Sequence, residues 1–430
     1  MDGDVMSASS PTWRAGTGSE RFTPDEPFWL AGYAARNGPA QGTLSDLYVT
    51  ALALQDAAGN KLVISSADII AIPVAIADAA AAIVRARHPD VARENFVFAA
   101  THTHYAPEIR PDKALFFKIP ADFAAKIPRA AQRLIEAIAA AMLCALDDLS
   151  PARLYVRHAT ATFAHNRRPH GDVFEHDVPI LDVRNPDNTV RSIVFGYACH
   201  NTTIEPQDGR YCADWAGYAR DRLQQLHPNS TALFIPGCGA DQNPDPRGTP
   251  ELSLTYGEDL ASSVHTALSM DSLEISPNLR LATTRVPFEM QLLTPQWIAD
   301  ALSSSDPPRI VKAKYLQDRL SRGETLETVY PGPMQAVRFG DELLMIFMSG
   351  EPVIDWSRNF KQMFASVAPH VWVSGYCNDM YGYIPTLKIQ REGGYEGGRA
   401  NLWSWLPTPW TESVEPTVTA AIQHLVKLVT

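Results

Sequence analysis

The sequence contains few cysteines, only five among 430 residues, and none of them belongs to a CxxC pair. An odd, scattered set of this kind excludes the disulfide framework of small secreted domains and favours a reducing compartment. The N-terminal segment has acidic residues where a signal peptide needs basic ones, and it lacks an apolar core. We therefore expect a cytoplasmic protein.

Basic charge and long apolar runs are also scarce. The chain has 37 Lys and Arg against 48 Asp and Glu, a formal net charge of −11, which argues against nucleic acid or an anionic membrane as a partner. The longest apolar stretch, residues 68–87, contains Asp68, Pro73 and Asp78, so it falls short of a membrane span of about 20 apolar residues. We expect no stable membrane insertion, and a homo-oligomer is compatible with the sequence.

What the sequence does contain is an alternation of strand-like and helix-like segments. Apolar β-branched runs predict strands at 48–54, 61–66, 96–100, 153–163, 178–183, 190–197, 231–235, 280–286, 334–339, 343–348 and 371–375. Helical periodicity predicts helices at 75–87, 121–149, 215–226, 295–304, 309–322, 355–365 and 414–428. This order predicts an α/β fold with a mixed β-sheet, or two, flanked by helices. The expected organisation is a flexible segment 1–14 and a single domain 15–430.

Polar side chains follow several predicted strands at the point where each strand ends. His102 and His104 follow residues 96–100, His200 follows 192–198, and Glu351 follows 343–349. The carboxyl ends of strands are where α/β proteins place their chemistry. Two imidazoles and a carboxylate from separate strand ends can hold a catalytic zinc and leave one position for water. The sequence therefore predicts a metal site at the strand exits.

Each of these residues also has a purely structural explanation. In an extended segment His102 and His104 would share one face, about 7 Å apart, so that one could bind metal and the other reach a substrate. Alternatively they are hydrogen-bonded histidines beneath a loop. Glu351 could be a carboxylate favoured by the dipole at a helix N-terminus. Tyr383, which follows the strand at 371–375, could be a packed core tyrosine.

Dispersed motifs give the sequence a resemblance to a known family. In chain order they are 65-SSAD-68, 101-THTHYAP-107, 165-HNRRP-169, 199-CHNTT-203, 213-ADWAG-217, 237-GCGADQNP-244, 350-GEP-352, 378-NDMYGYIPT-386 and 394-GYEGG-398. Together they resemble the neutral/alkaline non-lysosomal ceramidase family from about Ala15 to the C-terminus. The resemblance implies an amidase that acts on linear N-acyl bonds and holds one zinc ion per chain.

The resemblance also implies a role for each matching residue. The metal ligands would be His102, His200, Glu351 and Tyr383. His104 would either support a ligand or face the substrate, Arg167 would line the active site, and Tyr395 would lie nearby. Zinc-bound hydroxide would attack the carbonyl, Tyr383 or His104 would donate to the oxyanion, and His104 would protonate the leaving amine. Asp214 would either orient a ligand histidine or cap the helix that follows it.

The sequence departs from the family pattern in three places. Asn243 stands where the established ceramidases have a serine, and an amide can donate a hydrogen bond to an oxyanion but cannot be a nucleophile. Met380 replaces a tyrosine, and the sequence ends at residue 430 without the immunoglobulin-like C-terminal domain of longer secreted ceramidases. These differences favour a small soluble N-acyl amide, lactam or ester over a long-chain membrane lipid.

Two other functions remain open. Cys238 could be the nucleophile of a cysteine hydrolase, which would require a nearby histidine base and a lowered thiol pKa. The replacement of serine by Asn243 instead suits a non-catalytic zinc or ligand-binding protein on the same fold. The presence of both ligand histidines and Glu351 favours the zinc hydrolase.

Overall fold

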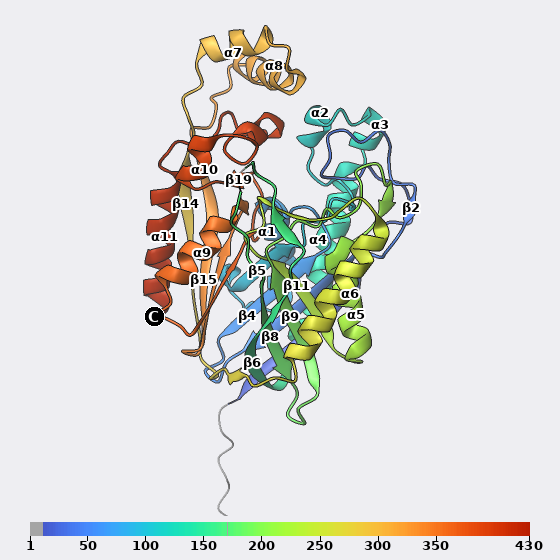
Figure 1. The fold of residues 1–430 in the computed structure, drawn as a ribbon, viewed down its shortest axis with the longest axis vertical. Coiled ribbons are helices and arrows are strands. Elements are labelled where there is room, and N and C mark those ends of the chain that lie inside the picture. The colour runs from blue at the N-terminus through green and yellow to red at the C-terminus, as the bar shows by residue number, and fades with distance from the viewer. Residues whose placement is uncertain (1–11, 170) are drawn as a thin grey trace, which may run out of the picture.

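The computed structural model describes residues 12–169 and 171–430. Within these residues, nine strands form one mixed sheet (Figure 1). Their order across the sheet is β11 (Thr231–Pro236), β9 (Val190–Tyr197), β8 (Asp177–Arg184), β6 (Ser150–Thr160), β1 (Trp13–Arg21), β3 (Tyr48–Gln55), β4 (Lys61–Ala67) and β5 (Phe96–Ala100), with β13 (Leu273–Glu274) beside β6. A second, four-stranded sheet has the order β14 (Leu279–Glu289), β15 (Val329–Phe339), β16 (Leu343–Met348) and β18 (His370–Ser374).

The two sheets pack face to face and each is covered by helices on its outer side, which gives four layers (Figure 1). Side chains of β4 show why, since Val63 lies in the core beneath the helices while Leu62 and Ile64 lie in the core between the sheets. The helices on the large sheet are α1 (Val74–Arg87), α4 (Ile127–Asp147), α5 (Asp214–Leu226) and α6 (Pro250–Ala267). Those on the small sheet are α9 (Ile354–Met363) and α11 (Val414–Val429).

Shorter elements lie at one end of the sandwich, where α7 (Pro295–Leu302) and α8 (Pro307–Ser321) project as a helical hairpin (Figure 1). Side chains of α8 pack with Trp29, Phe116 and Trp403 in a separate apolar cluster. The remaining short helices are η1 (Arg93–Asn95), α2 (Lys113–Phe116), α3 (Ala121–Ala124), α10 (Leu387–Glu392) and η2 (Arg399–Trp403). The remaining short strands are β2 (Gly42–Thr43), β7 (Ala164–Asn166), β10 (Arg210–Tyr211), β12 (Gln242–Pro244), β17 (Glu351–Pro352) and β19 (Tyr383–Ile384).

The predicted fold class, α/β with mixed sheets flanked by helices, is confirmed. The predicted helix 121–149 was wrong in its continuity, because the chain breaks between α3 and α4 and Pro128 lies in the first turn of α4. Most of the segment 1–14, expected to be flexible, lies outside the described residues, and β1 begins at Trp13. All five cysteines lie in the described part and are free thiols. No helix of the described residues is long and apolar enough to cross a bilayer.

The sheet topology brings several strand exits to one end. Strands β4 and β5, β9 and β11, and β16 and β18 are the parallel neighbours of the two sheets. Backbone bridges pair Ala99 with Cys377 and Gly237 with Ser374, so the ends of β5, β11 and β18 meet where the sheets approach each other. Residues after these strands, and after β9 and β16, therefore surround one point.

Candidate metal centre

Three buried histidines meet at these strand exits. His102 follows β5, His104 lies two residues further on, and His200 follows β9. Their nearest ring nitrogens all lie within 4.8 Å of one another, and Nε2 of His104 is 3.3 Å from Nε2 of His102. Two protonated nitrogens could not face each other at this distance, so the arrangement requires at least one lone pair directed inward.

The two neighbouring histidines do not lie in an extended segment. His102 has a φ of 63°, in the left-handed region that non-glycine residues seldom adopt. Its amide N–H donates to the carbonyl of Ile69 at 3.0 Å, which holds the turn in place. The expectation of an extended segment was wrong, because the backbone of His102 is left-handed; the two rings nevertheless line one cavity, with their centroids 5.0 Å apart.

Backbone carbonyls fix the orientation of two of the imidazoles. Nδ1 of His102 is 2.7 Å from the carbonyl of Ile70, and Nδ1 of His200 is 2.7 Å from that of Gly239. A carbonyl only accepts, so Nδ1 carries the hydrogen in both rings and Nε2 keeps its lone pair. This is the arrangement of metal-binding histidines, whose second nitrogen is held by a hydrogen bond. Burial and the charge of Arg167 lower the pKa of His200 to about 4, which keeps that ring neutral.

Asp214 does not orient a histidine. Its carboxylate accepts the backbone N–H of Thr203 at 2.9 Å and the hydroxyl of Ser253 at 2.7 Å. Asp214 is the first residue of α5, one position after the N-cap residue Ala213, and its Oδ1 also accepts the N–H of Trp215 in the first turn at 2.7 Å. Its role is therefore to hold the segment that follows His200, while carbonyl groups orient the ring.

Glu351 completes the cluster from the opposite sheet. Its Oε2 lies 3.4 Å from Nε2 of His102 and 3.6 Å from Nε2 of His200. The same oxygen is buried and has no hydrogen-bond partner among the described residues. An unpartnered buried carboxylate oxygen that faces two imidazole lone pairs is costly unless a cation lies between them. This donor set of nitrogen and oxygen suits a divalent metal such as zinc, so the residues fit the expected ion.

Arg167 forms hydrogen bonds with two of the other predicted site residues. Its guanidinium donates to the hydroxyl of Tyr383 at 3.1 Å, to Oδ1 of Asn243 at 3.3 Å and to Glu396 at 2.8 Å. Tyr383 lies beside Glu351 because β19 pairs with β17. The ring of Tyr395 lies 5.3 Å from that of Tyr383. All the predicted site residues are thus brought to one region, although their roles stay predictions.

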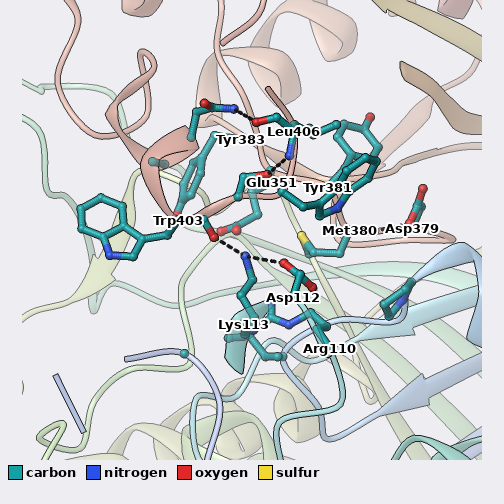
Figure 2. Close-up of a pocket in the computed structure, with 18 of the residues that line it drawn as sticks. Arg110, Asp112, Lys113, Glu351, Asp379, Met380, Tyr381, Tyr383, Trp403 and Leu406 are labelled. Atoms are coloured by element: carbon teal, nitrogen blue, oxygen red, sulfur yellow. Dashed lines mark hydrogen bonds and ion pairs between the residues drawn. The ribbon is translucent and has the colours of Figure 1, made fainter. Parts of the chain in front are cut away.

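The histidine cluster lies where two cavities meet. The first, of about 590 Å3, has His102 and Glu351 in its wall. Figure 2 shows part of this wall, with Tyr381, Met380 and Trp403 around the space next to Glu351. The second, of about 770 Å3, has His200 in its wall. Five residues line both cavities: Gly32, His104, Tyr383, Tyr395 and Glu396. The cluster is therefore accessible from two sides.

Solved structures share this architecture. No family model and no curated protein matches the sequence. The crystal structure of neutral ceramidase from Pseudomonas aeruginosa matches with a TM-score of 0.74 and 18% identity, over 97% of this chain and 74% of the ceramidase. A ceramidase complexed with C2 matches with a TM-score of 0.75 and 17% identity, over 97% of this chain and 75% of that one. This chain has the neutral ceramidase fold. The predicted resemblance is therefore confirmed at the level of the fold.

Two residues that line the centre were missed by the sequence analysis. In this version of the neutral ceramidase fold, Tyr376 places its ring 4.5 Å from that of His102, and its buried hydroxyl has no partner among the described residues. Glu396, 4% exposed, binds both Arg167 and Arg168. Glu396 could have been found from the 394-GYEGG-398 motif, whereas Tyr376 follows β18 in a segment without any recognisable pattern.

The geometry gives the cysteine alternative no support. Cys238 is fully buried, and burial raises the pKa of its thiol well above the ordinary value. Reactive cysteines need the opposite, a lowered pKa and access to substrate. Cys238 also lines neither of the two cavities beside the histidine cluster.

Proposed function

We propose that this protein is a zinc-dependent hydrolase that cleaves the amide bond of a small N-acyl substrate. The observation that carries the proposal is Oε2 of Glu351, buried and unpartnered opposite the Nε2 lone pairs of two carbonyl-anchored histidines. The position of this cluster between two cavities favours a linear amide, because the acyl and amine halves can then occupy separate spaces. His102, His200 and Glu351 would hold one zinc ion, whereas Tyr383, which the sequence resemblance places among the ligands, would instead donate to the oxyanion.

Zinc bound at this centre would act as a Lewis acid on the carbonyl oxygen and increase the acidity of a water molecule. His104 lines both cavities, and burial next to the other two imidazoles lowers its pKa well below the ordinary value. It is therefore a neutral base at rest. In our proposal its ring accepts a proton from the attacking water and passes it to the nitrogen of the leaving amine.

By donating to Tyr383 and Asn243, Arg167 orients these two side chains so that each can donate a hydrogen bond to the oxyanion. The hydroxyl of Tyr383 accepts an N–H of Arg167, so its own hydrogen remains free to donate. Oδ1 of Asn243 likewise accepts from Arg167, which leaves the amide NH2 of Asn243 as a donor. Each donor that faces the developing negative charge contributes about 3 kcal/mol to the stabilisation of a transition state. Tyr395 would cover the substrate from the cavity wall.

The proposal is tested by metal analysis and hydrolysis assays on the purified protein and three variants. We expect about one zinc per chain in the native protein and in His104→Ala, and loss of zinc in His200→Ala and Glu351→Ala. Hydrolysis of N-acyl substrates should fall by about 10²- to 10⁴-fold in His104→Ala, the range for a lost general base.

Three results would contradict the proposal. Hydrolysis by metal-free protein at the native rate would exclude the zinc mechanism. Loss of zinc in His104→Ala with retention in Glu351→Ala would make the three histidines the ligand set. Bound zinc without hydrolysis of any amide or ester would favour the non-catalytic binding protein.

We further propose that residues 15–430 fold as one unit in the cytoplasm. Support for one unit comes from the centre itself, since His102 and His200 belong to the large sheet and Glu351 follows a strand of the small one. Five free thiols suit a reducing compartment. Unfolding in two separate calorimetric transitions, or activity only in a secreted fraction, would argue against these two statements.

A further inference from the structure

The second cavity differs from the first in its charged residues. Three arginines line it together with two glutamates: Arg167, Arg168, Arg247, Glu392 and Glu396. Arg167 is held by Glu396 at 2.8 Å, and Arg168 by Glu392 at 3.0 Å and Glu396 at 2.9 Å. Both glutamates are thus engaged by two of the arginines, and the third arginine has no acidic partner among the described residues that line this cavity.

Arg247 is that third arginine. Within 12–169 and 171–430 its side chain forms no ion pair and no hydrogen bond to another residue. Its backbone is nevertheless fixed, because the next residue, Gly248, donates its N–H to the carbonyl of Thr203 at 2.6 Å and bridges Ile204. Thr203 and Ile204 continue the segment that begins with His200. The exposed guanidinium of Arg247 therefore lines the same cavity as His200, with its donors available to a ligand.

The first cavity offers no comparable charge. Glu108 holds Arg110 with two hydrogen bonds of 2.7 and 2.8 Å. Lys113 lies 3.4 Å from Asp112 and donates to the carbonyl of Trp403 at 2.5 Å (Figure 2). Much of the remaining wall is apolar, with Ile70, Ile109, Phe117, Ile135, Trp403 and Leu406 among its residues. An alkyl chain suits this space, whereas an anion would have to displace an existing partner of Arg110 or Lys113.

From this asymmetry we propose that the substrate is an N-acyl amino acid. The acyl chain occupies the first cavity, the amide lies at the histidine cluster, and Arg247 binds the carboxylate of the amino-acid half in the second cavity. This inference rests on the proposed amide hydrolysis and specifies its substrate class. The reaction adds one water across the C–N bond and yields a fatty acid and a free amino acid.

A matched pair of substrates tests the inference. N-decanoylglycine and N-decanoylethanolamine differ only in their terminal group, a carboxylate in the first and a hydroxymethyl group in the second. The native protein should favour the glycine conjugate in kcat/KM, and Arg247→Gln should lower this preference by about three- to tenfold, as expected for one partly exposed charge-assisted contact. Arg247→Glu should reverse it. Arg222→Gln removes an exposed arginine of α5 that lines neither cavity, so both rates should stay native.

A binding measurement separates this inference from the proposed chemistry. Calorimetric titration of metal-free protein with N-decanoylglycine needs no catalysis, and the Kd should rise by about three- to tenfold in Arg247→Gln. If neither conjugate is cleaved, the proposed function fails, while Arg247-dependent affinity would still support the ligand class. Equal selectivity and equal Kd in the native and Arg247→Gln proteins, or no binding at all, would overturn the inference even if amides are cleaved.

Discussion

At the scale of single residues, Gly32 sets the position of His104. A Cβ at Gly32, which has a φ of +93°, would lie 2.3 Å from Nδ1 and 2.4 Å from Cγ of that imidazole. Any side chain here must displace the ring and also adopt a left-handed backbone conformation. The absence of a side chain at one position therefore permits the proposed general base to stand beside His102.

Gly32→Ala should consequently impair catalysis more than metal binding. We expect hydrolysis to fall at least about tenfold and the free energy of unfolding to drop by about 1–2 kcal/mol from backbone strain, with zinc retained. Steady-state kinetics, metal analysis and denaturant unfolding measure the three effects. Gly38→Ala is the matched control, since a Cβ at Gly38 would meet nothing within 4 Å. Native kinetics in Gly32→Ala would show that the position of His104 is unimportant.

At the scale of elements, a single lysine fastens the helical hairpin α7–α8 to the wall of the first cavity. Lys312 of α8 is fully buried, and burial lowers the pKa of its amine well below the ordinary value. Its Nζ donates to the carbonyls of Asn401 at 3.2 Å and Ser404 at 2.6 Å and also contacts that of Leu406. Because these three residues line the first cavity, Lys312 connects the hairpin to the site.

Lys312→Met should loosen this connection without unfolding the protein. The three carbonyls would lose their donor, at a local cost of about 1–3 kcal/mol. Hydrogen exchange of the amides in 295–321 and 399–406 should then accelerate by about tenfold or more. Lys314→Met, at an exposed position of the same helix, is the control. Unchanged exchange in both segments would mean that other contacts hold the hairpin, such as its apolar cluster and the ion pair of Asp306 with Arg399.

The elements that could be predicted best from the sequence are those whose residues are nearly all buried, because burial gives them a continuous apolar pattern. The predicted strands 190–197 and 343–348 match β9 and β16 at both ends, since nearly every residue in them is buried. β1 was missed because it contains Gly16 and Gly18, which strands usually avoid. A Cβ at either glycine would lie within 2.1 Å of a carbonyl oxygen of α4. The close approach of α4, which is distant in sequence, therefore requires glycine at these two positions, and no local sequence pattern indicates this.

For the candidate site, too, local patterns predicted some features, and others depended on contacts between distant parts of the chain. Strand exits pointed to His102, His200 and Glu351, because parallel strands bring their carboxyl ends together. The contact between His102 and His104 could not be foreseen, since it depends on a left-handed backbone that tertiary contacts impose. Tyr376, with a φ of 59°, was missed for the same reason. Sequence thus indicates which residues reach the centre, while their mutual orientation depends on packing between the two sheets.

At the scale of the whole molecule, an ionic cluster joins the large sheet to the helix layer of the small one. Asp177 at the start of β8 lies 2.6 Å from Nδ1 of His158 and 2.8 Å from Nζ of Lys361 in α9. Burial would raise the pKa of Asp177, but the hydrogen bond from His158 and the charge of Lys361 outweigh it and lower the pKa to about 2. The ionised carboxylate therefore stabilises the folded state.

This cluster predicts an acid-sensitive contribution to stability. Because the pKa of Asp177 is lower in the folded than in the unfolded chain, the unfolded chain binds more protons between about pH 4 and pH 2. The contribution is complete above about pH 4 and is lost as the pH falls through about 2; partial exposure reduces it to about 1–2 kcal/mol. Denaturant unfolding at pH 6 and pH 3 should show the stability deficit of the Asp177→Asn variant shrinking by about half in acid. Asp271→Asn, at an exposed site, is the control, and a deficit independent of pH would contradict the assignment.

The packing of the whole molecule also predicts its thiol chemistry. Cys144 is exposed, whereas Cys199, Cys212, Cys238 and Cys377 are buried. Burial raises the pKa of all four buried thiols, and the thiolate is the reactive form. A disulfide exchange reagent should therefore titrate one thiol per native chain and five after unfolding. Rapid reaction of a second thiol in the native protein would show that the core opens.

The spacing of the cluster along the chain has a consequence for biosynthesis. His102 and His200 emerge from the ribosome long before Glu351, and the second sheet cannot form until β18, which begins at His370, has also been translated. Since domains fold as units while the chain is made from its N-terminus, the nascent polypeptide would carry these histidines without their carboxylate until late in translation. The proposed metal centre would therefore be complete only near the end of synthesis, and a chain that terminates before residue 351 would lack its carboxylate.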